Sequence, residues 1–136
     1  MNGENAAMPQ KANAVSKIVI VEDELIVAMD LSLRLTRLGY DVIGVFSTAE
    51  EALELCGKVQ PDLVLMDYML KGELNGIQAT ELLHSLFGTP VVMLTAIPEG
   101  SGAVRCDGYL VKPYELGGLK RAIDEALKNG REVRAS

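Results

Sequence analysis

The sequence predicts an α/β fold, a doubly wound parallel sheet of five strands in the order 2-1-3-4-5. Short apolar runs alternate with longer segments of helical periodicity, and this alternation is typical of a parallel sheet with helices on both faces. The runs are almost continuously apolar, as in strands that are buried on both faces. Right-handed crossovers with one reversal of strand order then give the doubly wound arrangement.

Five runs rich in valine, isoleucine and leucine predict the strands. β-Branched side chains favour strands because they pack well on a pleated, half-buried surface. In chain order, the expected strands cover residues 17–21, 41–45, 62–66, 91–94 and 108–111.

Four segments of helical periodicity predict the helices. The leucines of the first lie on one stripe, and Gly39 follows as a left-handed stop. Ser47 and Thr48 each precede a glutamate by three residues, which is a doubled capping-box pattern, and Gln78 fits the same pattern before the third helix. The expected helices cover residues 25–38, the segment from these caps to Gly57, a segment from Asn75 onward, and about 114–129.

Length and charge restrict the classes of function. With 136 residues, of which 49% are hydrophobic, the chain can bury one core and is not disordered. The net charge of −6 argues against direct nucleic-acid binding, which needs a basic patch. Two cysteines give no disulfide framework, and no apolar run approaches the roughly 18 residues that span a bilayer. We expect a cytoplasmic protein without a membrane anchor.

The chain reads as one domain with two short extensions. We expect a flexible N-terminal arm over residues 1–16, the folded domain over 17–130 and a C-terminal tail over 131–136. The first 16 residues contain one lysine and no apolar block, so they predict neither a signal peptide nor an anchor.

Five polar residues stand directly after four of the strands: Glu22, Asp23, Asp67, Thr95 and Lys112. The carboxyl ends of parallel strands meet at one edge of the sheet, and ligands bind there at the point where the strand order reverses. That point lies between the first and third strands, where the three carboxylates are expected. Unpaired carboxylates repel one another, so such a cluster holds a proton or binds a cation.

This set of groups suits a magnesium ion and a phosphoryl group. Mg²⁺ prefers oxygen ligands, and Asp67 can attack phosphorus to give an acyl phosphate. Lys112 can neutralise phosphoryl charge, and the Thr95 hydroxyl can donate to a phosphoryl oxygen. Each residue alone also has an ordinary explanation, such as a helix N-terminal charge cluster, a turn aspartate, a strand-end threonine or a solvated lysine. Their joint occurrence at four strand ends favours the phosphoryl site.

The segments IVIVEDE, PDLVLMDYML, VVMLTA and GYLVKPY resemble the receiver domain of two-component response regulators, over Lys17 to about Lys128. The resemblance implies a flavodoxin-like fold with Asp67 as the phosphoacceptor. It also implies that Glu22 and Asp23 form the acidic metal pair and that Lys112 binds phosphate.

The same resemblance assigns the remaining site residues, the cofactor and the partners. Thr95 and Tyr109 are the expected switch residues, and the backbone carbonyl of Met69 is an expected ligand of Mg²⁺. A sensor histidine kinase or a phosphotransfer protein is the expected phosphodonor, with a downstream protein that the sequence does not identify. A homodimer is left open. The resemblance implies a signalling domain that at most phosphorylates and dephosphorylates itself.

Two departures from the family pattern are visible. The segment after the acceptor has an extended D-x-x-L-x-G form, which resembles a subgroup often linked to PAS-containing sensor kinases. Between Thr95 and Lys112, the segment 96–107 is shorter than the usual one and contains Pro98 and two nearby glycines. Because proline and glycine oppose helix formation, we expect a short or irregular fourth helix there.

Two other classes of protein share part of this pattern. A magnesium-dependent phosphohydrolase of the haloacid dehalogenase type also uses an aspartyl nucleophile, but it usually carries a second aspartate two residues later, where this chain has Met69. A receiver-like module that only binds proteins does not need the acceptor, metal and lysine positions, and this chain has all of them.

Overall fold

The computed structural model describes residues 15–96 and 106–135, with side chains through Gly130. In the described residues, all the expected strands and helices are present, and most element ends agree within two residues. The elements are β1 (Lys17–Val21), α2 (Leu25–Arg37), β2 (Asp41–Phe46), α3 (Ala49–Lys58), β3 (Leu63–Asp67), α4 (Gly76–Phe87), β4 (Val91–Thr95), β5 (Gly108–Val111) and α5 (Leu116–Ala135).

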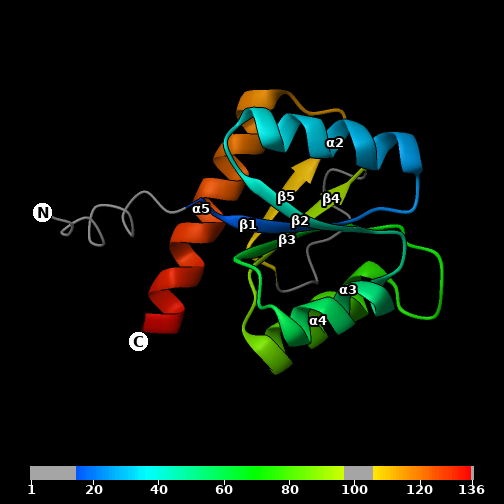
Figure 1. Cartoon of the computed structure of the whole chain (residues 1–136), viewed down its shortest axis with the longest axis vertical. Coiled ribbons are helices and arrows are strands. Elements are labelled where there is room, and N and C mark those ends of the chain that lie inside the picture. Colours follow the sequence, from blue (N-terminus) through cyan, green and yellow to red (C-terminus); the bar gives the residue numbers. More distant parts are fainter. Residues whose placement is uncertain (1–14, 97–105, 136) are drawn as a thin grey trace, which may run out of the picture.

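The five strands form one parallel sheet in the order β2-β1-β3-β4-β5, so the predicted topology is confirmed (Figure 1). β1 and β3 are neighbours although α2, β2 and α3 lie between them in the sequence. The chain therefore reverses its direction of winding between β1 and β3, and the carboxyl ends of these two strands lie side by side.

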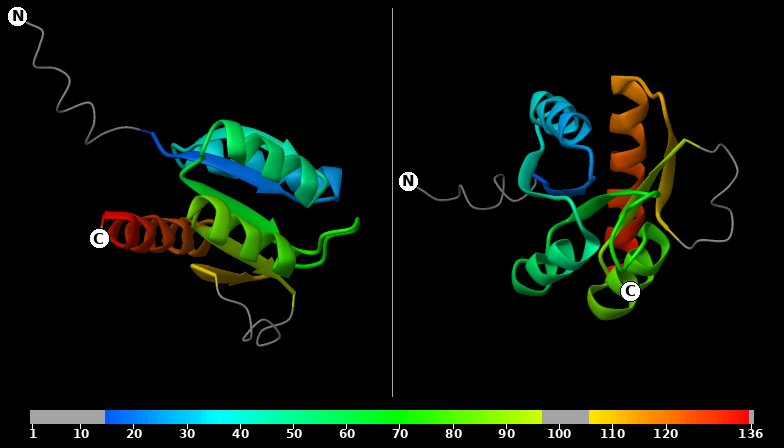
Figure 2. Two further views of the ribbon diagram at one scale, coloured as in Figure 1. Left: turned by 90° about the horizontal axis from the view of Figure 1, so that it is seen from below. Right: turned by 90° about the vertical axis from the view of Figure 1, so that its right-hand side faces the viewer.

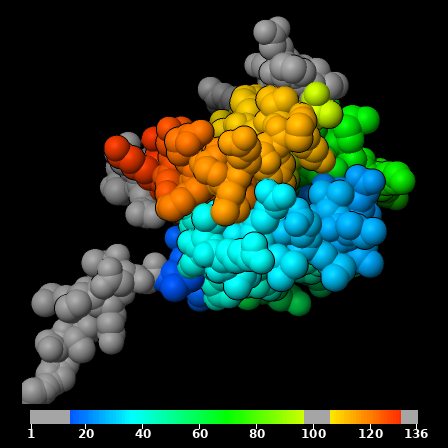
Figure 3. Space-filling view, turned by 90° about the horizontal axis from the view of Figure 1, so that it is seen from above, coloured from blue at the N-terminus to red at the C-terminus, as the bar shows by residue number. Residues whose placement is uncertain are grey.

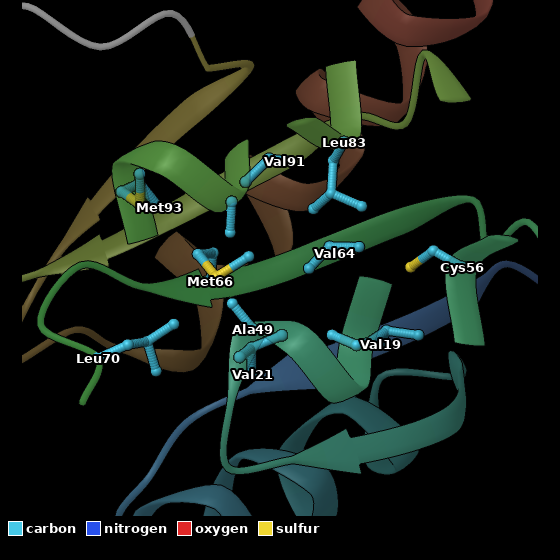
Figure 4. Close-up of a cluster of buried hydrophobic side chains, with 12 residues drawn as sticks. Val19, Val21, Ala49, Cys56, Val64, Met66, Leu70, Leu83, Val91 and Met93 are labelled. Carbon is cyan, nitrogen blue, oxygen red and sulfur yellow. The ribbon is translucent and has the colours of Figure 1, made fainter. Parts of the chain in front are cut away.

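Two layers of helices cover the two faces of the sheet (Figures 1 and 2). Successive strand residues point to opposite faces, so the three central strands, β1, β3 and β4, each contribute to two separate cores. The core beneath α3 and α4 is shown in Figure 4 and contains Val19, Val21, Ala49, Ala52, Cys56, Val64, Met66, Leu70, Ala79, Leu83, Val91 and Met93. The core beneath α2 and α5 contains Ile18, Ile20, Leu31, Leu35, Leu63, Leu65, Val92, Leu94, Leu119, Ile123, Ala126 and Leu127.

The expected helix caps are present in part. Asn75 and Gln78 form a reciprocal capping box at the start of α4. At the start of α3, Thr48 is the N-cap and its hydroxyl accepts a hydrogen bond from the Glu51 amide at 3.3 Å. Of the two overlapping patterns in the sequence, the later one therefore sets the start of α3. Gly39 has a φ of +96°, as expected of the stop after α2.

The predicted end of the last helix at Asn129 is wrong, because α5 continues past Gly130 to Ala135. The physical reason is close packing. A Cβ atom on Gly130 would lie within 2.4 Å of Pro90 Cγ, so the missing side chain lets α5 pass the start of β4. Gly130 therefore marks a close contact and not a helix stop.

The predicted short fourth helix falls mainly on residues 97–105, which lie outside the described residues. The expected arm lies almost entirely outside them as well, and the proposed domain boundaries stay predictions. Within the described ranges, no helix is long and apolar enough to cross a membrane.

Candidate functional site

The carboxyl ends of β1 and β3 bring three carboxylates together. Glu22 and Asp23, here called the acid pair, directly follow β1, and Asp67 is the last residue of β3. Val21 aligns with Met66 in the β1–β3 pair, so the next residue, Asp67, lies beside the acid pair. One carboxylate oxygen from each of the three residues lies within 4.8 Å of the others.

Glu22 is buried, and only one of its two carboxylate oxygens accepts a hydrogen bond. Its side chain is at the sheet edge because the Glu22 amide donates to the Phe46 carbonyl at 2.9 Å, which extends the β1–β2 ladder by one residue. Its Oε2 atom accepts from the Glu24 amide at 3.1 Å. Its Oε1 atom has no hydrogen-bond partner, and the Lys112 ammonium lies 3.5 Å away.

Burial raises the pKa of Glu22 to about 7, and the neighbouring charge of Asp67 contributes to the increase. The Glu24 amide and Lys112 act in the opposite direction. A buried carboxyl group with one unsatisfied oxygen is costly unless it binds a proton or a cation. Binding of a proton or a cation by Glu22 would therefore be favourable.

Among the described residues, Lys112 is the cationic side chain that lies against these carboxylates. Its backbone amide donates to the Thr95 carbonyl at 2.8 Å, which fixes the chain after β5 beside the end of β4. Its Nζ atom lies 3.4 Å from Asp67 Oδ1. Burial lowers the pKa of Lys112, but Asp67 and Glu22 more than offset that effect, so the pKa is raised and the ammonium stays charged.

The loop after Asp67 is folded back onto the carboxylates. The Met69 amide donates to Asp67 Oδ1 at 3.3 Å, and the Lys71 amide donates to Asp23 Oδ2 at the same distance. These bonds orient two of the three carboxylates. The Met69 side chain is 68% exposed, so at this position the residue contributes no side chain to the site, and its predicted role depends on its backbone carbonyl.

Thr95 lies on β4, which pairs with β3, and Tyr109 lies on β5, which pairs with β4 at the edge of the sheet. Thr95 is buried at the end of β4 and aligns with Val111 of β5. Tyr109 aligns with Met93, further from the strand ends, and is partly exposed. The structure therefore places Thr95 at the edge that holds the carboxylates and Tyr109 on the neighbouring edge strand. Their roles in switching stay predictions.

The residues present fit a magnesium ion. Mg²⁺ takes oxygen ligands and commonly uses one or two carboxylates while it keeps several waters. Three carboxylates converge here, and the buried Glu22 Oε1 has no hydrogen-bond partner. An oxygen-only donor set of this kind disfavours zinc, which prefers nitrogen and sulfur ligands.

A family model described as the response regulator receiver domain matches residues 18–124. The chain belongs to the response regulator receiver family. This family assignment confirms the resemblance seen in the sequence, and it makes the chain a receiver domain of the two-component type. The comparisons do not favour a phosphohydrolase or a receiver-like interaction module.

Individual relatives agree with the family assignment. The chain is 34% identical over 136 residues to the transcriptional regulatory protein PdtaR of Mycobacterium tuberculosis, which covers 96% of this chain and 63% of PdtaR. It is 34% identical over 120 residues to the phyllosphere-induced regulator PhyR of Methylorubrum extorquens, which covers 85% of this chain and 45% of PhyR. The chain thus spans only part of the length of these curated relatives.

Two solved structures also support the fold. The signal receiver domain of a modulated diguanylate cyclase from Desulfovibrio desulfuricans G20 matches with a TM-score of 0.80 at 33% identity, and the match covers 86% of this chain and 97% of that one. The solution structure of the PhyR receiver domain from Erythrobacter litoralis matches with a TM-score of 0.75 at 31% identity, covering 85% and 92% of the two chains.

Two features beside the site were not recognised in the sequence. Glu50 of α3 accepts a hydrogen bond from the loop after Asp67. Leu25, at the start of α2, lines a cavity of about 290 Å³ that it shares with the acid pair. The sequence does not signal either contact, because an exposed glutamate in the first turn of a helix and a leucine in an amphipathic helix are both common.

Proposed function

We propose that the chain accepts a phosphoryl group on Asp67 from a histidine-borne donor and changes conformation to signal to a partner protein. The observation that carries the proposal is the position of the Lys112 ammonium, 3.4 Å from Asp67 Oδ1, at the same strand edge as the acid pair. A nucleophile, a cation for phosphoryl charge and an oxygen-rich metal site are the parts that phosphoryl transfer requires.

Transfer from phosphohistidine to Asp67 is a single displacement at phosphorus. A carboxylate oxygen of Asp67 forms the new P–O bond while the P–N bond to the donor breaks. The imidazole nitrogen leaves and takes up a proton. The Lys112 ammonium lies within reach of a phosphoryl oxygen on Asp67, and the Thr95 hydroxyl is the proposed donor to a second one.

The acid pair, Asp67 and the Met69 backbone carbonyl would hold Mg²⁺. When bound, the ion supplies positive charge that neutralises the oxygens of the transferring group. The chain itself orients these ligands through the Met69 and Lys71 amides. We propose no further enzymatic activity beyond self-phosphorylation and self-dephosphorylation.

The exposed surface of α2 supports a protein as the phosphodonor, such as a sensor histidine kinase or a phosphotransfer protein. Ile26, Met29 and Leu33 recur at helical spacing, and Ile26 is 82% exposed. Together with exposed Leu25 they form what we call the α2 face. Figure 3 shows α2, in blue to cyan, open to solvent beside α5 in orange.

The α2 face is continuous with the site, because Leu25 lines the same cavity as the acid pair. Exposed apolar patches of this kind mark protein interaction sites. A donor protein that covers the α2 face is brought next to Asp67. The acidic net charge of −6 disfavours direct binding to nucleic acid, so we propose that the downstream partner is also a protein. We also propose a cytoplasmic location, because two cysteines give no disulfide framework.

Incubation with acetyl phosphate and Mg²⁺, followed by intact mass measurement, tests the proposed function. Wild-type protein should gain about 80 Da, the mass of one phosphoryl group. Asp67→Asn, which keeps the size of the side chain, should gain nothing, and excess EDTA should block the reaction of the wild type. Equal mass gain in the variant and the wild type would exclude Asp67 as the acceptor.

A further inference from the structure

The loop between β3 and α4, residues 68–75, is tied down by two carboxylates from other parts of the chain. The loop has no regular secondary structure. Its Lys71 amide donates to Asp23 Oδ2 at 3.3 Å, and its Leu74 amide donates to Glu50 Oε2 at 3.0 Å. Asp23 belongs to the acid pair, whereas Glu50 lies in the first turn of α3. The loop therefore connects α3 to the carboxylate cluster.

Packing and backbone conformation also hold the loop next to these two hydrogen bonds. The Leu70 side chain is buried and joins the core that contains Val21 and Ala49, where Figure 4 shows it at one end of the cluster. Gly72 then adopts a φ of +107°, a left-handed conformation that favours glycine. A Cβ atom at Gly72 would lie 3.7 Å from Glu50 Oε1, so the loop turns directly against this glutamate.

The position of the loop determines where the Asp67 and Asp23 carboxylates are held. The loop carries Met69, whose amide donates to Asp67 Oδ1 at 3.3 Å, and Lys71, whose amide holds Asp23. Hydrogen bonds from outer groups orient metal ligands and control metal affinity, and their loss typically weakens binding about 10- to 100-fold. Release of the loop at Leu74 would loosen both orienting amides together.

We propose that Glu50 is a positioning residue of the metal site. Its carboxylate holds loop 68–75 against α3 through the Leu74 amide, and the loop in turn holds the Asp23 carboxylate and the Met69 backbone for Mg²⁺. This inference rests on the proposed function. Glu50 itself touches neither the ion nor the phosphoryl group.

Three variants test the inference. Glu50→Ala removes the acceptor for the Leu74 amide, and Glu50→Gln keeps an oxygen acceptor without the charge. Glu54→Ala is the matched control, because it removes an exposed carboxylate one turn further along α3 that pairs with Lys58 at 3.7 Å. Mg²⁺ is titrated into each protein while the amide NMR signals of Asp23 and Met69 are followed, and Leu74 hydrogen exchange is measured without metal.

We expect Glu50→Ala to bind Mg²⁺ about tenfold more weakly than wild type and to exchange the Leu74 amide faster. Glu50→Gln should retain most of the affinity, and Glu54→Ala all of it. Phosphorylation of Glu50→Ala by acetyl phosphate should be slow at limiting Mg²⁺ and return to the wild-type rate at saturating Mg²⁺. A merely structural role would lower the thermal midpoint without this dependence on Mg²⁺.

Each other outcome counts against the inference. Normal Mg²⁺ affinity in Glu50→Ala, with normal binding by wild type, overturns the positioning role and leaves the proposed function intact. Glu50→Gln as weak as Glu50→Ala also overturns it, because charge and not the hydrogen bond would then matter. A wild-type chain that binds no Mg²⁺ overturns the proposed function and the inference together.

Discussion

Lys112 Nζ lies 3.4 Å from Asp67 Oδ1, although the two residues are 45 positions apart in the chain. The fold brings them together across β4, because Asp67 ends β3 and Lys112 follows β5. The lysine is held there by its own backbone bond to the Thr95 carbonyl. A change of charge on Asp67 therefore alters its electrostatic interaction with the Lys112 ammonium, and Lys112 belongs to the segment that follows β5.

Replacement of Lys112 should slow phosphorylation without unfolding the domain. Lys112→Met keeps the length of the side chain but removes the charge that faces the transferring group. We expect the rate with acetyl phosphate to fall about a hundredfold, the scale for loss of one preorganised electrostatic group. The rate of phosphorylation of Lys112→Arg should lie between the rates of Lys112→Met and wild type. A wild-type rate for Lys112→Met, measured at saturating Mg²⁺, would contradict the role of the ammonium.

The pKa of Glu22 predicts how stability depends on pH in the metal-free protein. Burial raises this pKa from 4.5 to about 7, so between these values the folded chain binds more protons than the unfolded chain. The stabilising contribution of this group is therefore complete below pH 4.5 and is lost as the pH rises through about 7. Denaturant unfolding without Mg²⁺ should show this decrease, and Glu22→Gln should remove it.

Mg²⁺ binding should follow the opposite trend, because the ion requires the ionised carboxylate. We expect the affinity, on the order of millimolar, to increase as the pH rises through about 7, where Glu22 ionises. Titrations of the wild type on either side of that pH measure the change. Constant Mg²⁺ affinity across this range, or the same pH dependence in Glu22→Gln, would show that Glu22 is not the titrating group.

The α2 face should matter for a protein donor and not for a small one. Ile26→Ser removes the most exposed apolar side chain of this face and leaves the three carboxylates, Lys112 and Thr95 unchanged in sequence. Phosphotransfer from the cognate phosphohistidine protein should slow at least several-fold, whereas labelling by acetyl phosphate should be unchanged. Leu86→Ser on α4 is the control, because Leu86 is also exposed but lies on the other layer of helices. Equal effects of the two variants on protein phosphotransfer would argue against a docking role.

Gly130 should not tolerate a side chain although it lies in a helix. Alanine normally stabilises a helix interior relative to glycine by up to about 1 kcal/mol. At Gly130, however, a Cβ atom would lie within 2.4 Å of Pro90 Cγ, and overpacking of this kind costs about 1–3 kcal/mol. Gly130→Ala should therefore lower the free energy of unfolding. In Gly118→Ala, the new Cβ atom would lie at an ordinary 3.8 Å from Leu110 Cδ1, so this variant should leave the free energy of unfolding unchanged or raise it.

The sequence predicted the features that depend on local pattern. Continuous apolar runs identified every strand, and the Asn75 and Gln78 spacing identified a capping box that the structure contains. The strand ends also indicated which carboxylates would meet, because the topology of a parallel sheet fixes where those ends lie. The convergence of Asp67 with the acid pair follows from strand order and needs no knowledge of side-chain packing.

The remaining features depend on contacts between distant residues. A glycine late in a helical pattern reads as a stop, and only the approach of Pro90 shows that Gly130 serves a close contact instead. The bond between Glu50 and the Leu74 amide joins residues 24 positions apart, and no local pattern marks it. The same holds for Asp23 and Lys71, which are 48 positions apart.

Locating the phosphoryl group tests most directly whether Asp67 is the phosphoacceptor. Protein phosphorylated with acetyl phosphate and Mg²⁺ is reduced with borohydride, which converts an aspartyl phosphate to homoserine, and is then digested and sequenced by mass spectrometry. We expect homoserine at position 67 and unmodified carboxylates at Glu22 and Asp23. Homoserine at Asp23 or at another aspartate, with Asp67 intact, would contradict this assignment.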